Sequence, residues 1–353
     1  MTDRPSTQAS ATPEPGRQTR WRRTAERKNS RALSFLGMGA VVALIAVVVL
    51  IGAPDLTVVA GTVRSVGIDK APTVTVAPKA TPRGTAPRVT TGSTQWTTRT
   101  YSMTVGGINR SYVVERPAVT PPSRLPVVVE LGGCCTTVSV EVARADFQQV
   151  TNSAIVVYPE YIDGNWNAGA CCGTPATNHI NDVAFVNAVI VAVQSSQADA
   201  STGPVYLAGY SNGGKLAAMM ACQEPATFAG VAVYGATRTS DCSNPGAESL
   251  LEMVGSADPG TAISGTPIVQ NNYTEPTVEQ MVAEYRAADG CGPTASSSST
   301  AGVATETLWT QCAGGHSVGV VVYQGDNHTW PEASGATPSA QHIMWSFFAS
   351  LGA

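Results

Sequence analysis

The stretch Val205-Tyr-Leu-Ala-Gly-Tyr-Ser-Asn-Gly-Gly-Lys-Leu-Ala-Ala-Met-Met220 joins a short apolar run to a longer one through a glycine-rich turn centred on Ser211. Residues Gly209 to Gly213 fit the pattern Gly-x-Ser-x-Gly, in which a strained turn from a strand into a helix exposes the serine oxygen at the end of a sheet. The five residues alone are a weak signal in a chain with 34 glycines. The apolar segments on both sides strengthen it, and together they predict a nucleophile elbow at Ser211.

Short apolar runs alternate with segments of helical length through most of the chain. Such runs favour a mostly parallel, doubly wound α/β sheet with helices on both faces. The predicted strands are 101–105, 110–115, 125–131, 154–158, 205–208, 230–234, 250–254, 306–310 and 318–323; the predicted helices are 138–151, a segment from 181, 213–222, 277–288 and 339–348. With the elbow after a central strand, this is the order of an α/β-hydrolase fold.

The first 95 residues differ in composition from the rest. Residues 1–31 hold eight Lys and Arg against three acidic residues, and residues 32–53 hold no charge. Residues 32–53 would span roughly 33 Å as a helix, enough to cross a bilayer, with the basic flank in the cytoplasm. We expect a basic cytoplasmic tail, a transmembrane anchor or signal over 32–53, a disordered Thr/Pro-rich stalk over 54–95 and an extracytoplasmic catalytic domain over 96–353. The apolar run exceeds the usual signal-peptide core of about 7 to 15 residues, which favours an uncleaved anchor over secretion after cleavage.

Charge narrows the possible partners. The whole chain carries −4, and residues 1–31 carry eight positive and three negative charges, a net of +5, so the remainder carries −9. A mildly acidic body argues against a nucleic-acid partner. The partners we expect are a membrane, through residues 32–53, and a substrate.

Eight cysteines in an exported chain favour disulfides over metal ligands, and neither Cys-x-x-Cys nor His-x-x-x-His spacing occurs. We expect neither a metal nor a cofactor. Cys222 with Cys242 and Cys291 with Cys312 are the predicted local disulfides. The remaining cysteines are expected to bridge between two adjacent pairs, with a bond inside each pair as the alternative; those pairs are Cys134-Cys135 and Cys171-Cys172.

A serine nucleophile needs a histidine to take its proton and a carboxylate to orient that histidine, in the chain order Ser, Asp or Glu, His on this fold. His316, His328 and His342 follow the elbow. His328 comes after the carboxyl end of a predicted strand, where the active sites of open α/β sheets gather, whereas His316 precedes that strand and His342 lies in a helical pattern. Asp258 also follows a strand's carboxyl end and is the predicted acid, with an Asp-Pro turn as the alternative.

Other residues near these motifs have predicted roles. The backbone N–H groups of Asn212 and Cys134 would form the oxyanion hole, the latter from the glycine turn after the 125–131 strand. Trp166 and Trp330 would offer aromatic faces to a substrate, with a buried core role as the alternative for Trp166. Asp182 is expected to be a helix N-cap or first-turn carboxylate outside the site.

The chain resembles the secreted esterases of the polyhydroxybutyrate depolymerase and feruloyl esterase group of α/β hydrolases over roughly residues 96–353. The motifs are Leu131-Gly-Gly-Cys134, Gly164-Asn-Trp-Asn-Ala-Gly-Ala-Cys-Cys-Gly173, Asn181-Asp-Val-Ala-Phe185, Gly-Tyr-Ser211-Asn-Gly-Gly, Gly255-Ser-Ala-Asp258 and His328-Thr-Trp-Pro331. The resemblance implies that Ser211, Asp258 and His328 form a triad. Gly132 stands where the family usually has a histidine, and Gly255 lies in a Val-Gly-Ser sequence where His-Gly is common.

These features predict an extracytoplasmic serine esterase that hydrolyses carboxylic esters through an acyl-enzyme. The expected substrate is a polyhydroxyalkanoate or its oligomers, or a feruloyl or acetyl ester. It would be a small molecule, a polyester or an ester of a cell-wall polysaccharide. The alternatives are a cell-envelope acyltransferase on the same fold and a non-catalytic surface binding module.

Overall fold

The computed structural model describes residues 95–119, 123–203, 205–242, 245–246 and 248–353. The cytoplasmic tail, the membrane segment and nearly all of the stalk predicted above lie outside these ranges. Within them, no helix combines the length and the apolar character needed to cross a membrane.

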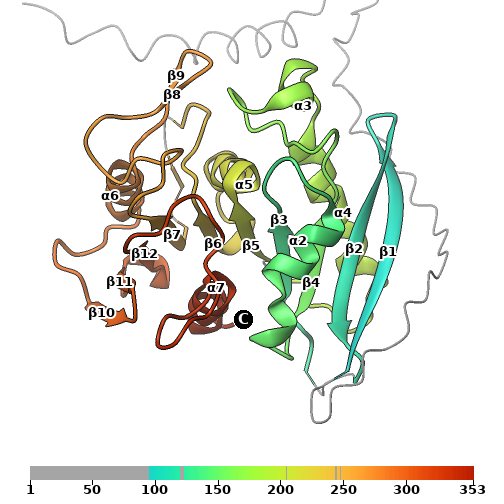
Figure 1. Cartoon of the computed structure of the whole chain (residues 1–353). Coiled ribbons are helices and arrows are strands. Elements are labelled where there is room, and N and C mark those ends of the chain that lie inside the picture. The colour runs from blue at the N-terminus through green and yellow to red at the C-terminus, as the bar shows by residue number, and fades with distance from the viewer. Residues whose placement is uncertain (1–94, 120–122, 204, 243–244, 247) are drawn as a thin grey trace, which may run out of the picture. The chain divides into compact units, whose positions relative to one another are not determined.

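A ten-stranded sheet forms the centre of the described domain, in the order β1-β2-β4-β3-β5-β6-β7-β12-β11-β10. The six strands from β4 to β12 run parallel, whereas β1, β2, β11 and β10 are antiparallel to their neighbours and occupy the two edges (Figure 1). The strands are β1 (Trp96–Val105), β2 (Ile108–Pro117), β3 (Val127–Leu131), β4 (Ile155–Pro159), β5 (Val205–Tyr210), β6 (Phe228–Tyr234), β7 (Leu250–Gly255), β10 (Ser297–Ala301), β11 (Ala304–Trp309) and β12 (Val318–Tyr323). The predicted α/β-hydrolase sheet is thus confirmed.

Helices cover both faces of the sheet, which is why its central strands are largely apolar. All five residues of β3 are buried. Val127 and Val129 pack in the core beneath α4 (Asp182–Ser196), α5 (Ser211–Gln223) and α6 (Val278–Ala288). Val128 points to the opposite core, beneath α2 (Val138–Ala145) and α7 (Ala340–Ser350). Successive side chains of a strand alternate between faces, so a run buried on both sides is mostly apolar; buried Glu130 in β3 is paired with Arg144.

Sequence patterns misplaced several boundaries. The helix predicted over 138–151 ends at Ala145, because Asp146 adopts a left-handed conformation with φ of 31°, and a single 3₁₀ turn follows at Phe147–Gln149. Serine-rich β10 is fully exposed, so it has no apolar run that could reveal it. The short helix α3 (Gly173–Thr177) and the ribbon of β8 (Val269–Gln270) and β9 (Tyr273–Thr274) were missed for the same reason.

The eight cysteines form four disulfides. Cys222–Cys242 and Cys291–Cys312 are bonded, as predicted. The expectation of bridges between the two adjacent pairs is wrong: Cys134 bonds Cys135, and Cys171 bonds Cys172. Each adjacent pair closes on itself within its own turn, so no sulfur remains for a bridge between the turns.

Candidate active site

The predicted elbow is present where β5 ends at Tyr210 and α5 begins at Ser211. Ser211 has a φ of 52°, a left-handed conformation that is rare for a residue with a side chain and typical of strained functional positions. A Cβ on Gly209 would lie 2.8 Å from the carbonyl oxygen of Gly213, and one on Gly213 would lie 2.0 Å from that of Leu131. Both positions therefore need glycine so that helix and strands can approach closely.

Ser211, His328 and Asp258 form a continuous hydrogen-bonded chain. Ser211 Oγ lies 2.6 Å from His328 Nε2, and His328 Nδ1 lies 2.7 Å from Asp258 Oδ2. The Asp258 side chain has no exposed surface, whereas 33% of the imidazole surface is exposed. A serine, a base and a buried carboxylate at these distances can activate a hydroxyl for attack on a carbonyl carbon.

The parallel sheet brings these three residues together, because each follows the carboxyl end of a strand: Ser211 after β5, Asp258 after β7 and His328 after β12. The backbone N–H of Gly260 donates a 2.7 Å hydrogen bond to Asp258 Oδ1, which fixes the carboxylate. At Gly235, with a φ of 63°, a Cβ would lie 3.1 Å from the imidazole, so glycine makes room for the histidine.

Two tyrosines that were not predicted as site residues hold the histidine loop. The hydroxyl of Tyr210 donates to the carbonyl oxygen of His328 at 2.6 Å, and that of Tyr234 donates to the carbonyl oxygen of Asn327 at 3.0 Å. Burial raises the pKa of Tyr210, so its hydroxyl stays protonated as a donor. Tyr210 directly precedes Ser211, and this adjacency is the one signal in the sequence that points to its role.

The glycine turn after β3 lies beside the nucleophile, since a Cβ on Gly133 would come within 3.4 Å of Ser211 Cβ. Two of its N–H groups have other partners: Gly133 donates to Glu141 Oε2 at 3.3 Å, and Cys135 donates to the carbonyl oxygen of Gly164 at 2.8 Å. The Cys134 N–H between them has no acceptor among the described residues. It therefore remains free to donate to an oxyanion.

Both tryptophans predicted to bind substrate are buried. Trp166 has no exposed surface, and its indole N–H donates to the carbonyl oxygen of Gly132 at 3.0 Å. Trp330 is 4% exposed and donates to Gln341 Oε1 at 3.1 Å. This burial corrects the prediction, because side chains packed in the core offer no face to a substrate; the core alternative for Trp166 holds.

The remaining candidates lie away from the nucleophile. His316 pairs with Asp289, with 2.9 Å between Nδ1 and Oδ1. His342 is exposed on α7. Asp182, in the first turn of α4 as predicted, is buried and ion-paired with Arg110 at 2.5 Å.

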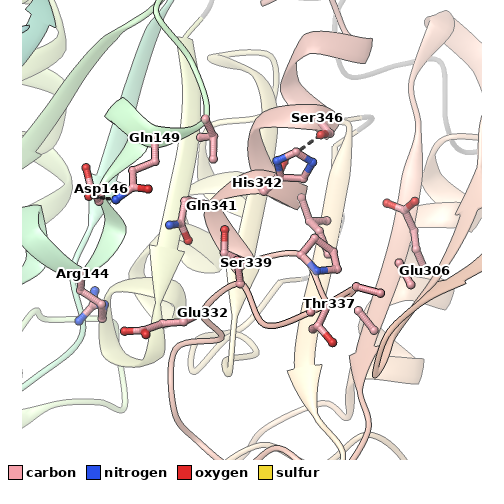
Figure 2. Close-up of a pocket in the computed structure, with 18 of the residues that line it drawn as sticks. Arg144, Asp146, Gln149, Glu306, Glu332, Thr337, Ser339, Gln341, His342 and Ser346 are labelled. Carbon is pink, nitrogen blue, oxygen red and sulfur yellow. Dashed lines mark hydrogen bonds between the residues drawn. The ribbon is translucent and has the colours of Figure 1, made fainter. Parts of the chain in front are cut away.

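A cavity of about 870 Å³ lies between α2, α7, β10–β11 and residues 332–339, and no triad residue lines it (Figure 2). Two residues that line this cavity nevertheless contact side chains next to the candidate active site. Arg144, which lines it, packs 4.3 Å from the centre of the Tyr210 ring, and Gln341 accepts the Trp330 hydrogen bond.

Comparison with known proteins agrees with this architecture. Residues 110–278 match the family model described as esterase PHB depolymerase. The acetyl xylan esterase from Aspergillus awamori superposes with a TM-score of 0.50 at 14% identity, covering 68% of this chain and 94% of that chain. An S-formylglutathione hydrolase from Agrobacterium tumefaciens gives a TM-score of 0.46 at 13% identity, covering 74% of this chain and 94% of its own. No curated protein sequence matches.

The doubly wound sheet and the elbow after β5 define the protein as an α/β hydrolase. Residues 110–278 match the family model described as esterase PHB depolymerase, in agreement with the motifs of the sequence. The chain is therefore a carboxylic ester hydrolase.

Proposed function

We propose that the protein is an extracytoplasmic serine esterase in which Ser211, His328 and Asp258 form an acyl-enzyme with carboxylic esters. The observation that carries the proposal is the chain of 2.6 Å and 2.7 Å contacts from Ser211 Oγ through the imidazole to Asp258, which begins at a residue held in left-handed geometry. The substrate we propose is a hydroxyalkanoate oligomer or polyester, or a feruloyl or acetyl ester, in line with the family match.

Acylation begins when His328 Nε2 takes the proton of Ser211 Oγ as the oxygen attacks the ester carbonyl. Asp258 holds the imidazole with Nδ1 protonated and stabilises the imidazolium that forms. Collapse of the tetrahedral intermediate breaks the bond to the alcohol, which leaves with the proton from Nε2. Water then attacks the acyl-enzyme with the same histidine as base, and the acid is released.

The negative oxygen of the intermediate is bound by the N–H groups of Asn212 and Cys134. Asn212 lies in the first turn of α5, where backbone N–H groups lack intrahelical acceptors and the helix dipole favours an anion. Losing one such donor typically costs about 10²- to 10³-fold in kcat.

Two features support an extracytoplasmic location. All eight cysteines are bonded in disulfides, which persist in oxidising compartments. The uncharged run at 32–53 follows a basic segment, as in a membrane anchor with the chain after it exported. Protease treatment of intact cells should remove the domain; full protection, with cleavage after lysis, would contradict this location.

A fluorophosphonate probe tests the nucleophile. The folded protein should be labelled on Ser211, and Ser211→Ala should abolish labelling, whereas Ser298→Ala on exposed β10 should not change it. A folded protein that never labels would overturn the proposal.

The acyl and alcohol groups require a substrate panel. Nitrophenyl esters of increasing acyl length, methyl ferulate and a hydroxybutyrate oligomer should be compared by kcat/KM. Added alcohol should leave free acid as the main product; transesterified product in excess would favour the acyltransferase instead.

A further inference from the structure

We propose that Asn212 and Trp166 are positioning residues that aim the Cys134 N–H at the oxyanion. This inference rests on the proposed esterase mechanism. Asn212 would then act twice, through its own N–H and through a side chain that fixes the second donor. Neither side chain touches the reacting atoms, so the role is indirect and makes its own kinetic prediction.

The first link is the carboxamide of Asn212, on a residue that is 2% exposed. Its Oδ1 accepts the backbone N–H of Trp166 at 2.7 Å, and its Nδ2 donates to the carbonyl oxygen of Trp166 at 3.1 Å. One side chain therefore satisfies both backbone groups of one residue in a neighbouring loop. Buried polar pairs of this kind are costly to break, so the loop is held at a fixed place relative to the elbow.

The second link runs from that loop to the glycine turn. The indole of Trp166 donates to the carbonyl oxygen of Gly132 at 3.0 Å, and Gly164 accepts the Cys135 N–H at 2.8 Å. The indole cannot reorient freely, because it is fully buried, with the Tyr161 ring packed edge-on against it at 5.6 Å. Loop 164–166 thus contacts the turn on both sides of Cys134.

The third link fixes the turn from α2. Glu141 is 1% exposed and accepts the Gly133 N–H at 3.3 Å, while its carboxylate also contacts Thr136 and Arg144. The N–H groups of Gly133 and Cys135 and the carbonyl oxygen of Gly132 are therefore occupied, and the Cys134 N–H is left without an acceptor among the described residues. Donors of an oxyanion hole work at about 2.7 to 3.1 Å from the developing charge, so a displaced turn would weaken this contact chiefly in the transition state.

The test removes one hydrogen-bonding link at a time and measures whether kcat or KM changes. Trp166→Phe deletes the indole N–H and keeps a large aromatic ring, and Asn212→Ser shortens the clamp. Each should lower kcat about 10- to 100-fold, somewhat less than loss of a whole donor, and leave KM within about twofold because substrate binding does not use this hydrogen bond. Trp309→Phe is the matched control: that indole lies beside Arg286, and its N–H has no partner among the described residues.

A second readout separates positioning from general damage. Thionoesters replace the carbonyl oxygen with sulfur, a poor hydrogen-bond acceptor, so they gain little from an oxyanion hole. The ratio of oxoester to thionoester kcat/KM should therefore fall by the same 10- to 100-fold factor in both variants and stay at the wild-type value in Trp309→Phe.

An unchanged ratio in Trp166→Phe and Asn212→Ser, or a kcat within twofold of wild type in both, would overturn the inference. If one variant does not fold, the other decides. Failure of the esterase mechanism itself would show differently, as a Ser211→Ala variant that keeps full activity.

Discussion

Two histidine–aspartate pairs in this domain are nearly alike locally and differ in their surroundings. His328 contacts Asp258 at 2.7 Å and His316 contacts Asp289 at 2.9 Å, each through Nδ1. Both carboxylates have no exposed surface, and the imidazoles are 33% and 30% exposed. A histidine held by a buried carboxylate is therefore not sufficient evidence of a catalytic base.

The difference is the end of β12 at which each histidine lies. His316 precedes Val318, the first residue of the strand, and His328 follows Tyr323, the last. Only the carboxyl end adjoins the elbow, because parallel strands place their carboxyl ends along one edge of the sheet. The Nε2 of His328 meets Ser211 there, whereas the pair of His316 lies beside the Cys291–Cys312 disulfide.

Replacing the two histidines gives the largest expected contrast. His328→Ala should lower kcat by roughly 10⁵- to 10⁶-fold, as loss of a triad base does elsewhere. His316→Ala should leave kcat within about threefold, since it contacts no reacting group. Steady-state hydrolysis of a nitrophenyl ester measures both, and comparable losses in the two variants would contradict the assignment.

Replacing the two carboxylates gives the next contrast. Asp258→Asn should reduce kcat by roughly 10⁴-fold, because the amide favours the wrong imidazole tautomer. Asp289→Asn should instead lower the free energy of unfolding by about 1 to 3 kcal/mol through a weakened buried hydrogen bond, with activity nearly unchanged. Denaturant unfolding and kcat measured on the same preparations separate the two effects.

A disulfide lies beside each of the two histidine–aspartate pairs: Cys134–Cys135 near His328 and Cys291–Cys312 near His316. Replacing Cys134 and Cys135 together with serine should lower kcat about tenfold, a part of the effect of losing an oxyanion donor. Replacing Cys291 and Cys312 together should cost about 2 to 4 kcal/mol of stability with no change in kcat. The idea fails if the first pair of substitutions leaves kcat intact.

Glu248 gives the smallest expected effect, on stability alone. Burial, with a contribution from Asp289, raises its pKa to about 9 from an ordinary value of 4.5. Between those two pH values the folded state holds a proton that the unfolded state releases, so this group makes stability fall as pH rises. Glu248→Gln removes that dependence: its Tm relative to wild type should increase steadily from pH 5 to pH 9. Exposed Glu279→Gln should show no such trend.

Much of the fold could be predicted from sequence because its signals are local. Apolar runs at 127–131 and 205–210 mark strands that are buried on both faces, and the predicted and observed bounds differ by two residues or fewer. Prediction from sequence failed where a strand has no apolar pattern, as in β10, or where one residue ends a helix early, as Asp146 does. The residues of the proposed triad could be selected because a strand's carboxyl end can be predicted from sequence.

The sequence by itself determined the elbow, since Gly-x-Ser-x-Gly stands between two apolar runs and a Cβ on Gly209 would meet the carbonyl oxygen of Gly213, four residues further on. Only the tertiary structure decided which polar groups meet. The clamp of Trp166 by Asn212 and its hydrogen bond to Gly132 join residues 46 and 34 positions apart in the chain. Local sterics and hydrophobic periodicity belong to neighbours in the chain, whereas the partners of buried polar groups depend on how the strand ends and loops assemble in space.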